Sequence, residues 1–276
     1  MAQASAHAAS QESPHAACTE EVLQAVTQLV ARGRQDPYAE LEARIGLRAP
    51  KSKQLQAGYG PPSDQSDQVF QELVGSLDRV VKHSPLWSAL DMTLSQVQYY
   101  EQNLRRVMTH KANAQFQQIG PVEQVHQEKT RQSLVDTQTG KHQWVLRFAY
   151  QREAPLTQET HPSATAILSQ PPYRVVARHR RSYLYTLPTL PTQAISTHSD
   201  HQAEQAEAQS KLRFRVDVSF VAAGKDKKAL DGQQPSVQGE VEILLPIPDT
   251  FSDEAVAKAW VGLAHHLVPS SVLKRI

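Results

Sequence analysis

One strand can be read directly from the sequence: Lys211-Leu-Arg213-Phe-Arg215-Val-Asp217-Val-Ser219-Phe-Val221. From 211 to 219 the odd positions carry ionic or hydroxyl side chains, and the even positions carry Leu, Phe and Val. Because successive side chains of a strand point to opposite faces, this period of two predicts a β-strand with one apolar face and one charged face. The charged face is rich in Arg, the residue best suited to bidentate recognition of phosphate.

The same alternation recurs along the chain and predicts a mainly β, α+β fold. Segments rich in Val, Leu, Tyr and Phe alternate in this way, which predicts strands at 38–46, 97–108, 125–135, 143–153, 173–185, 211–221 and 238–245. Apolar residues at helical spacing predict packing helices at 19–31, at 66–83 and after Ser252, a good N-cap. The polar connections 189–210 and 224–237 are predicted to be loops.

The bulk properties favour one large β domain. The chain has 276 residues, one Cys and a formal net charge of +1. We predict a disordered tail at 1–18 and a single domain at 19–276, with its core at 36–246 and a C-terminal helix at 252–267. A lone Cys excludes an internal disulfide framework, no apolar run approaches the roughly 20 residues of a bilayer span, and the N-terminus does not read as a secretory signal. We therefore expect a soluble cytosolic or nuclear protein without a membrane partner.

Two Glu-x-Glu strands lie at the two ends of the predicted β region. Glu40 and Glu42 share one face of the first strand, and Glu240 and Glu242 share one face of the last. Side chains two apart on a strand lie about 7 Å apart, and in a closed barrel the first and last strands can be neighbours. Carboxylates gathered in this way repel one another unless a cation lies among them, and oxygen ligands favour Mg²⁺ or Mn²⁺.

Basic side chains follow the same alternation on other predicted strands. They include Arg147, Arg178, Arg180, Arg213 and Arg215, with Arg105, Arg106, Lys129 and Arg131 on two earlier strands. One interpretation is the outer face of a β-sandwich, with cross-strand ion pairs worth a few tenths of a kcal/mol each. The other is a cavity that holds a metal and a polyphosphate together. Surface strands prefer Lys and Thr, so the predominance of Arg favours the cavity.

The order of these motifs resembles that of the fungal- and protozoal-type mRNA 5′-triphosphatases, the mRNA capping enzyme beta-subunit family of the triphosphate tunnel metalloenzyme superfamily. The resemblance covers about residues 36–246 and rests on five motifs: Glu40-Leu-Glu42-Ala-Arg44-Ile-Gly46, Arg147-Phe-Ala-Tyr-Gln-Arg152-Glu153, Arg178-His-Arg180-Arg-Ser182-Tyr183, Arg215-Val-Asp217-Val-Ser219 and Glu240-Val-Glu242. The chain departs from the family pattern at Gln238 and Leu244, where some members have a third acid, and Ser219 replaces the usual Thr.

This resemblance implies an eight-stranded antiparallel β-barrel that forms a tunnel, with a few packing helices. It implies a hydrolase that removes the γ-phosphate of 5′-triphosphate RNA in the first step of mRNA capping. The implied ligands of Mg²⁺ or Mn²⁺ are Glu40, Glu42, Glu240 and Glu242, and the implied triphosphate contacts are Arg147, Arg178, Arg180 and Arg215. Glu153 would orient or activate the attacking water, and Asp217 would orient a neighbouring Arg. Arg106, Lys129 and Arg213 are further candidates for phosphate contact.

The implied partners are the 5′-triphosphate end of RNA and an RNA guanylyltransferase. The implied compartment is the nucleus, with the cytoplasm as the alternative, and a homodimer stays open because some relatives are dimers. Two other functions also stay open: a tunnel enzyme acting on tripolyphosphate, thiamine triphosphate or free nucleotides, and a non-catalytic tunnel-like scaffold in a transcription complex. The scaffold predicts loss of the Glu-x-Glu pairs, and both pairs are present. The sequence identifies no aromatic residue that would stack on an RNA base at a tunnel mouth.

Overall fold

The computed structural model describes residues 19–48, 55–59, 66–138, 144–157, 159, 161–188, 211–230 and 232–267. The predicted tail at 1–18 and the predicted loop at 189–210 lie outside these residues. Within the described ranges, none of the helices is long and apolar enough to cross a membrane.

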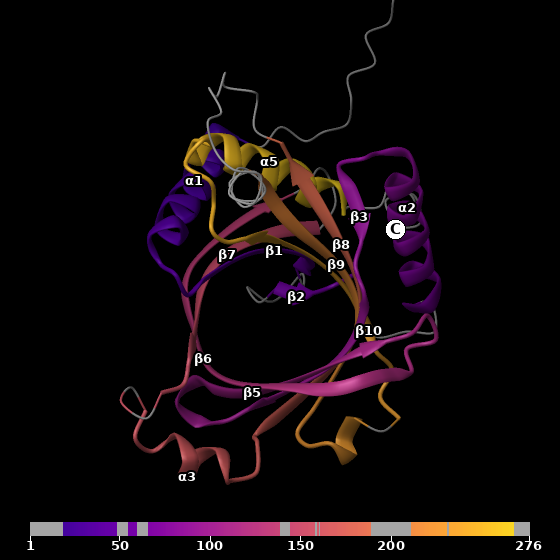
Figure 1. Ribbon diagram of the computed structural model, residues 1–276, viewed down its shortest axis with the longest axis vertical. Coiled ribbons are helices and arrows are strands. Elements are labelled where there is room, and N and C mark those ends of the chain that lie inside the picture. The colour runs from indigo at the N-terminus through magenta and orange to yellow at the C-terminus, as the bar shows by residue number, and fades with distance from the viewer. Residues whose placement is uncertain are drawn as a thin grey trace, which may run out of the picture.

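Eight antiparallel strands of the described chain close into a ring (Figure 1). The ring strands are β1 (Ala39–Arg48), β4 (Met92–Tyr99), β5 (Leu104–Ala112), β6 (Gln118–Gln138), β7 (Trp144–Pro155), β8 (Arg174–Leu187), β9 (Leu212–Gly224) and β10 (Ser236–Leu244). Their order around the ring is β10-β9-β8-β4-β5-β6-β7-β1, and β1 also pairs with β10. The short strands β2 (Leu55–Ala57) and β3 (Trp87–Ala89) pair with β1 and β8. The predicted eight-stranded antiparallel tunnel is confirmed.

The predicted strand at 97–108 is wrong, because it merges two strands. It spans the end of β4, the 3-10 turn η1 (Glu101–Asn103) and the start of β5. Gln102 and Asn103 take the left-handed backbone at φ values of 56° and 60°, so the chain reverses without the Gly or Pro that usually marks a turn.

Some elements are longer than the sequence pattern predicts, and others were not predicted at all. The predicted strand at 125–135 covers only the middle of the 21-residue β6, whose first part contains Gly120 and Pro121, residues that usually mark a turn. The short helix α3 (Ala164–Leu168), the 3-10 turn η2 (Lys228–Leu230) and the strands β2 and β3 were not predicted. Short elements of this kind carry too few residues to establish a period.

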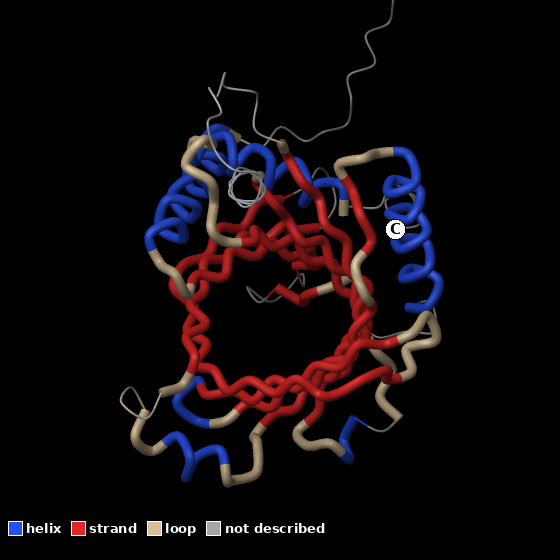
Figure 2. Tube along the Cα trace, in the orientation of Figure 1, coloured by secondary structure: helices blue, strands red, loops and turns tan. Residues whose placement is uncertain are grey.

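All three predicted helices are present and lie on the outside of the ring (Figure 2). They are α1 (Glu20–Gln35), α2 (Ser66–His83) and α5 (Asp253–His266). The side chain of Ser252 accepts a hydrogen bond of 3.2 Å from the backbone N–H of Ala255, as expected of an N-cap.

The main hydrophobic core lies between these helices and the outer face of the ring. Trp260 of α5 is fully buried, meets Phe148 edge-on at 5.1 Å between ring centroids, and donates its indole N–H to the Val241 carbonyl at 3.0 Å. Leu41 and Ile243 of the paired strands β1 and β10 belong to the same core. Because the apolar faces of these strands point outward to the helices, the opposite faces point into the tunnel.

Candidate active site

The ring closes at a seam where β1 and β10 pair. Glu42 lies directly opposite Glu242, and Arg44 lies opposite Glu240. The prediction that a closed barrel brings the two Glu-x-Glu strands together is therefore confirmed.

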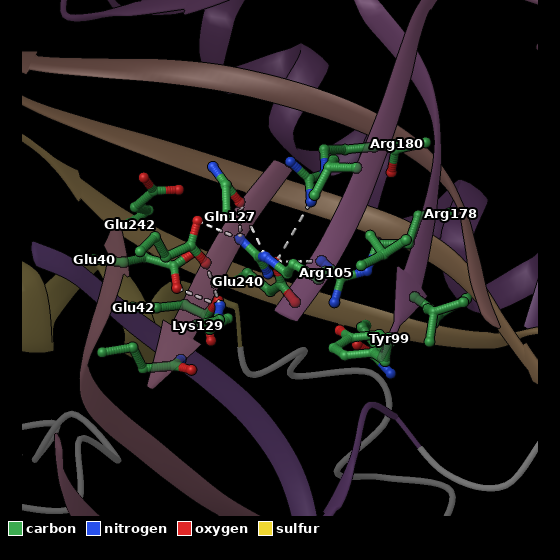
Figure 3. A pocket seen from close by; sticks show the side chains of 18 of the residues that line it. Glu40, Glu42, Tyr99, Arg105, Gln127, Lys129, Arg178, Arg180, Glu240 and Glu242 are labelled. Carbon is green, nitrogen blue, oxygen red and sulfur yellow. Dashed lines mark hydrogen bonds and ion pairs between the residues drawn. The ribbon is translucent and has the colours of Figure 1, made fainter. Parts of the chain in front are cut away.

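The tunnel encloses a cavity of about 560 Å³ (Figure 3). Its lining, within the described chain, includes eight basic residues and five carboxylates: Arg44, Arg105, Lys129, Arg131, Arg174, Arg178, Arg180 and Arg215, and Glu40, Glu42, Glu153, Glu240 and Glu242. With all of them ionised, the lining carries a formal charge of +3. Such a cavity suits a ligand that concentrates several negative charges.

On the β5–β6–β7 wall, the cations hold the carboxylates in place. Lys129 forms ion pairs with Glu40 and with Glu153, the second at 2.6 Å. Arg105 forms an ion pair with Glu153 and donates two hydrogen bonds, of 3.0 and 2.7 Å, to Oε1 of Gln127. Charge-assisted contacts of this kind fix long side chains before any ligand arrives.

On the opposite wall, Asp217 of β9 positions two guanidinium groups. Its Oδ2 lies 3.2 Å from Arg180 and 3.1 Å from Arg215. Arg178 and Arg180 of β8 also approach Oε2 of Glu240, at 3.6 and 3.9 Å. The orienting role that the resemblance implies for Asp217 is compatible with these contacts and stays a prediction.

The pKa values of the five carboxyls divide them into two groups. Burial is the largest influence on each and favours the neutral acid. In Glu240, the nearby Arg side chains outweigh burial and hold the pKa well below its usual range. In Glu153, the two cations of its wall outweigh burial and lower the pKa to about 2. Burial prevails in Glu40 and Glu42, whose pKa values are raised, and it raises the pKa of Glu242 to about 8.

The seam carboxylates suit a hard divalent cation by their chemistry. They are oxygen donors on two paired strands, and Glu42 and Glu240 are only 4% and 5% exposed. Nε of Arg44 lies 3.0 Å from Oε1 of Glu240 without the alignment of a hydrogen bond, so this buried oxygen retains capacity to accept a cation.

In the arrangement described, Arg44, Lys129 and Arg215 hold the seam carboxylates by ion pairs. Among the residues that the structure describes, no three His, Cys, Asp or Glu side chains converge as a metal site would require. Ligation would therefore exchange these ion pairs for metal contacts.

Most of the predicted site residues meet in this cavity. Nine of them line it, namely Glu40, Glu42, Lys129, Glu153, Arg178, Arg180, Arg215, Glu240 and Glu242, and Asp217 lies directly behind two of the Arg side chains. The charged faces of strands that are distant in sequence carry the same Arg and Glu side chains because these faces line one cavity.

Three predicted phosphate contacts lie outside the cavity lining. Arg106 has the wrong parity, since its neighbour Arg105 points inward. Arg106 instead donates to the Leu168 carbonyl at 3.1 Å. Arg147 is held by Asp136 through contacts of 2.7 and 2.8 Å. Arg213 shares the inward face of β9 but lies toward its start, opposite Leu244. The structure does not support a direct role for these three residues.

The cavity lining also contains residues that the sequence did not assign to the site: Arg44, Arg105, Arg131, Arg174 and Gln127. Arg44 could have been found, because it continues the even parity of the first Glu-x-Glu strand. Arg105 could not be separated from Arg106, because the merged strand at 97–108 left the parity of β5 undetermined.

Solved structures share the closed antiparallel fold of this chain. One is the RNA triphosphatase Pct1 of S. pombe, at 12% identity over 90% of this chain and 86% of that chain, with a TM-score of 0.50. The same protein in complex with the Spt5 CTD matches at 10% identity over 90% and 92% of the two chains, with a TM-score of 0.50. The Mimivirus capping enzyme triphosphatase matches at 10% identity over 91% and 99%, with a TM-score of 0.47. No family model and no curated protein sequence matches the chain.

Proposed function

We propose that this protein is a metal-dependent polynucleotide 5′-triphosphatase that removes the γ-phosphate from 5′-triphosphate RNA ahead of mRNA capping. The observation that carries the proposal is the cavity, in which cations on two walls face a seam of four carboxylates. A triphosphate offers several charges on one short chain, so it can engage both walls and the seam at once. The fold shared with the S. pombe RNA triphosphatase supports RNA as the substrate.

The basic side chains bind and position the triphosphate. Arg178, Arg180 and Arg215 approach from β8 and β9, and Arg105 and Lys129 approach from the β5–β6 wall. Phosphoryl transfer depends chiefly on positioning and electrostatic stabilisation. Because Glu153 and Asp217 are not among the proposed metal ligands, the cations that pair with them stay fixed and need little reorganisation as charge shifts onto the leaving group.

The seam residues Glu40, Glu42, Glu240 and Glu242 would hold Mg²⁺ or Mn²⁺. When bound, such an ion supplies Lewis-acid polarisation of the γ-phosphoryl group. Three of these four carboxyls have raised pKa values, which shows that the neighbouring cations do not fully offset the cost of burying their charges.

Glu153 orients the attacking water. Its pKa of about 2 keeps it ionised at neutral pH, so it accepts hydrogen bonds but is too weak a base to take a proton early in the reaction.

The product would be diphosphate-ended RNA, the substrate of an RNA guanylyltransferase, and we expect both proteins to act in the nucleus.

The test is phosphate release from γ-labelled triphosphate-ended RNA with Mg²⁺ or Mn²⁺. We expect metal-dependent release that falls about 100-fold or more in Glu42→Gln and in Glu242→Gln. The matched control is Glu254→Gln, because Glu254 lies on the outer helix α5 and pairs with Lys258 there.

Two results would redirect the assignment. Release from tripolyphosphate, thiamine triphosphate or free nucleotides, but not from RNA, would favour another tunnel hydrolase. Inactivity of folded wild-type protein on every one of these substrates would favour the scaffold.

A further inference from the structure

One part of the cavity wall is apolar, although the cavity as a whole is ionic. Val97, Val176 and Val221 are buried together, and Val107 and Tyr99 pack against them. All five residues line the cavity, on the inward faces of β4, β5, β8 and β9. On β8 this places a valine between two inward arginines, where the strand alternation would otherwise continue the charged surface.

Aromatic rings lie at the open end of this apolar wall. Tyr173 lines the cavity with 59% of its surface exposed, which places it at the rim. Its backbone N–H donates to the Tyr99 carbonyl at 3.0 Å, and the guanidinium of Arg174 lies 5.7 Å from the centre of the Tyr99 ring. Asn103, in the turn that joins β4 and β5, also lines the cavity and offers an amide at the same rim. In Figure 3, Tyr99 lies across the cavity from the seam carboxylates.

An apolar wall makes no favourable contact with a metal ion or an inorganic polyphosphate. Valine side chains offer neither charge nor hydrogen bonds to phosphate oxygens, and the small part of their surface that faces the cavity is stabilised by an apolar ligand surface packed against it. The ligand that suits this wall has a flat π-face and polar edges. Such rings stack on tyrosine and are attracted by arginine.

The spacing along β8 connects the apolar wall to the phosphate-binding arginines. Val176 lies two residues from Arg178, and Arg174 lies four residues from it, which correspond to about 7 Å and about 13 Å along a strand. One ligand with a triphosphate at one end and an aromatic ring at the other can therefore occupy both regions.

We propose that Val97, Val176, Val221, Tyr99 and Tyr173 form a nucleoside subsite that receives the base and ribose of the first nucleotide of the substrate. This inference rests on the proposed triphosphatase function and adds the property that selects the substrate class. The subsite favours triphosphates that carry a nucleoside over inorganic tripolyphosphate. Because every base has a π-face, stacking on Tyr99 tolerates any first base, as a cap-forming enzyme requires.

The experiment compares kcat/KM for three substrates: triphosphate-ended RNA, a nucleoside triphosphate and inorganic tripolyphosphate. Tyr99→Leu keeps apolar volume against the valines, and Tyr99→Ala removes it. Both variants should lose about 5- to 150-fold on the two substrates that carry a base, and less than about twofold on tripolyphosphate. Tyr38→Ala is the matched control, because Tyr38 also faces an arginine, Arg152 at 5.0 Å, but lies outside the cavity lining.

An equal loss on all three substrates would mean that Tyr99 only supports the fold, and no loss on any substrate would mean that no base binds there. Either result overturns the subsite. If wild-type protein hydrolyses none of the substrates, the proposed function fails and binding decides the inference separately. Calorimetry would then compare a methylene-bridged nucleoside triphosphate with methylene-bridged tripolyphosphate. The subsite is supported if the wild-type protein binds the nucleoside compound more tightly than the tripolyphosphate and if Tyr99→Leu abolishes this difference. Equal affinities in the wild-type protein refute it.

Discussion

Replacing Arg105 with Gln should remove most of the activity, whereas the same replacement at Arg106 should leave kcat within about twofold of wild type. The two residues are neighbours on β5, and strand alternation sends their side chains to opposite faces. Arg105 is 8% exposed and points into the cavity, where loss of one charge-stabilising group costs about 10²- to 10³-fold in kcat. Arg106 donates to the Leu168 carbonyl outside the cavity.

The loss of stability can be worked out from the contacts of Glu153. Lys129 and Arg105 together take its pKa from 4.5 to about 2 against the effect of burial, which corresponds to about 3 kcal/mol at neutral pH. Lys129 has the larger influence and remains in the variant, so loss of Arg105 costs about 1 kcal/mol. The unmet acceptor on Gln127 adds about 1 kcal/mol. The total of about 2 kcal/mol lowers Tm by about 4–8 °C.

The pH dependence of this loss has a definite sign. Because the pKa of Glu153 is lowered in the folded protein, its contribution is fully present above pH 4.5 and disappears as the pH falls toward 2. The stability difference between wild type and Arg105→Gln should therefore narrow below about pH 4.

The assay pairs phosphate release with chemical unfolding for both variants. Arg106→Gln should lose about 1–2 kcal/mol through its hydrogen bonds, so stability alone cannot separate the two variants, but kcat can. Equal kcat for both variants, or full activity in Arg105→Gln, would refute the assignment of β5 faces on which the cavity depends.

Three further predictions address the hydrophobic core, the seam carboxylates, and the two inward-facing arginines that lie outside the cavity lining. Trp260→Phe should lower the free energy of unfolding by about 2–3 kcal/mol in denaturant, through loss of indole volume and of the bond to Val241; an unchanged midpoint would contradict that contact. Metal-free protein should lose about 2–4 kcal/mol of stability between pH 5 and pH 9, because the pKa of Glu242 near 8 means that the folded state keeps a proton which the unfolded state has released. Glu242→Gln should flatten this profile in thermal melts, and a profile that rises with pH in wild type would reverse the reasoning. Arg147→Gln and Arg213→Gln should each keep phosphate release within about twofold, and a tenfold loss in either would place that side chain at the substrate.

Much of the site could be predicted because alternation on a strand assigns each side chain to a face without further information. Glu40, Glu42, Glu240 and Glu242 were found in this way, and closure of the ring brought them together as expected. Parity does not reveal how far along the tunnel a residue lies. Arg147 and Arg213 share the inward face with true lining residues, yet lie beyond the cavity.

The remaining errors come from a turn that the sequence conceals. Gln102 and Asn103 reverse the chain with positive φ values and without Gly or Pro, so β4 and β5 read as one strand. That single omission hid the inward direction of Arg105 and the place of Tyr99 at the end of β4. The apolar wall escaped notice for a related reason, since isolated valines on a charged face acquire meaning only when four strands bring them together.

Closure of the ring through β1 and β10 also has a consequence for biosynthesis. Glu42 and Glu242 stand opposite each other although 200 residues separate them in the chain, so the seam cannot form until the last ring strand has been made. Pairing at such separation is slow, because a long loop must close before the contact stabilises it. Until then the free edges of β1 and β9 are unpaired and invite aggregation. A nascent or truncated chain that lacks β10 would retain most of the ring strands but not Glu240 and Glu242. Its site would be incomplete, so only full-length chains would be active.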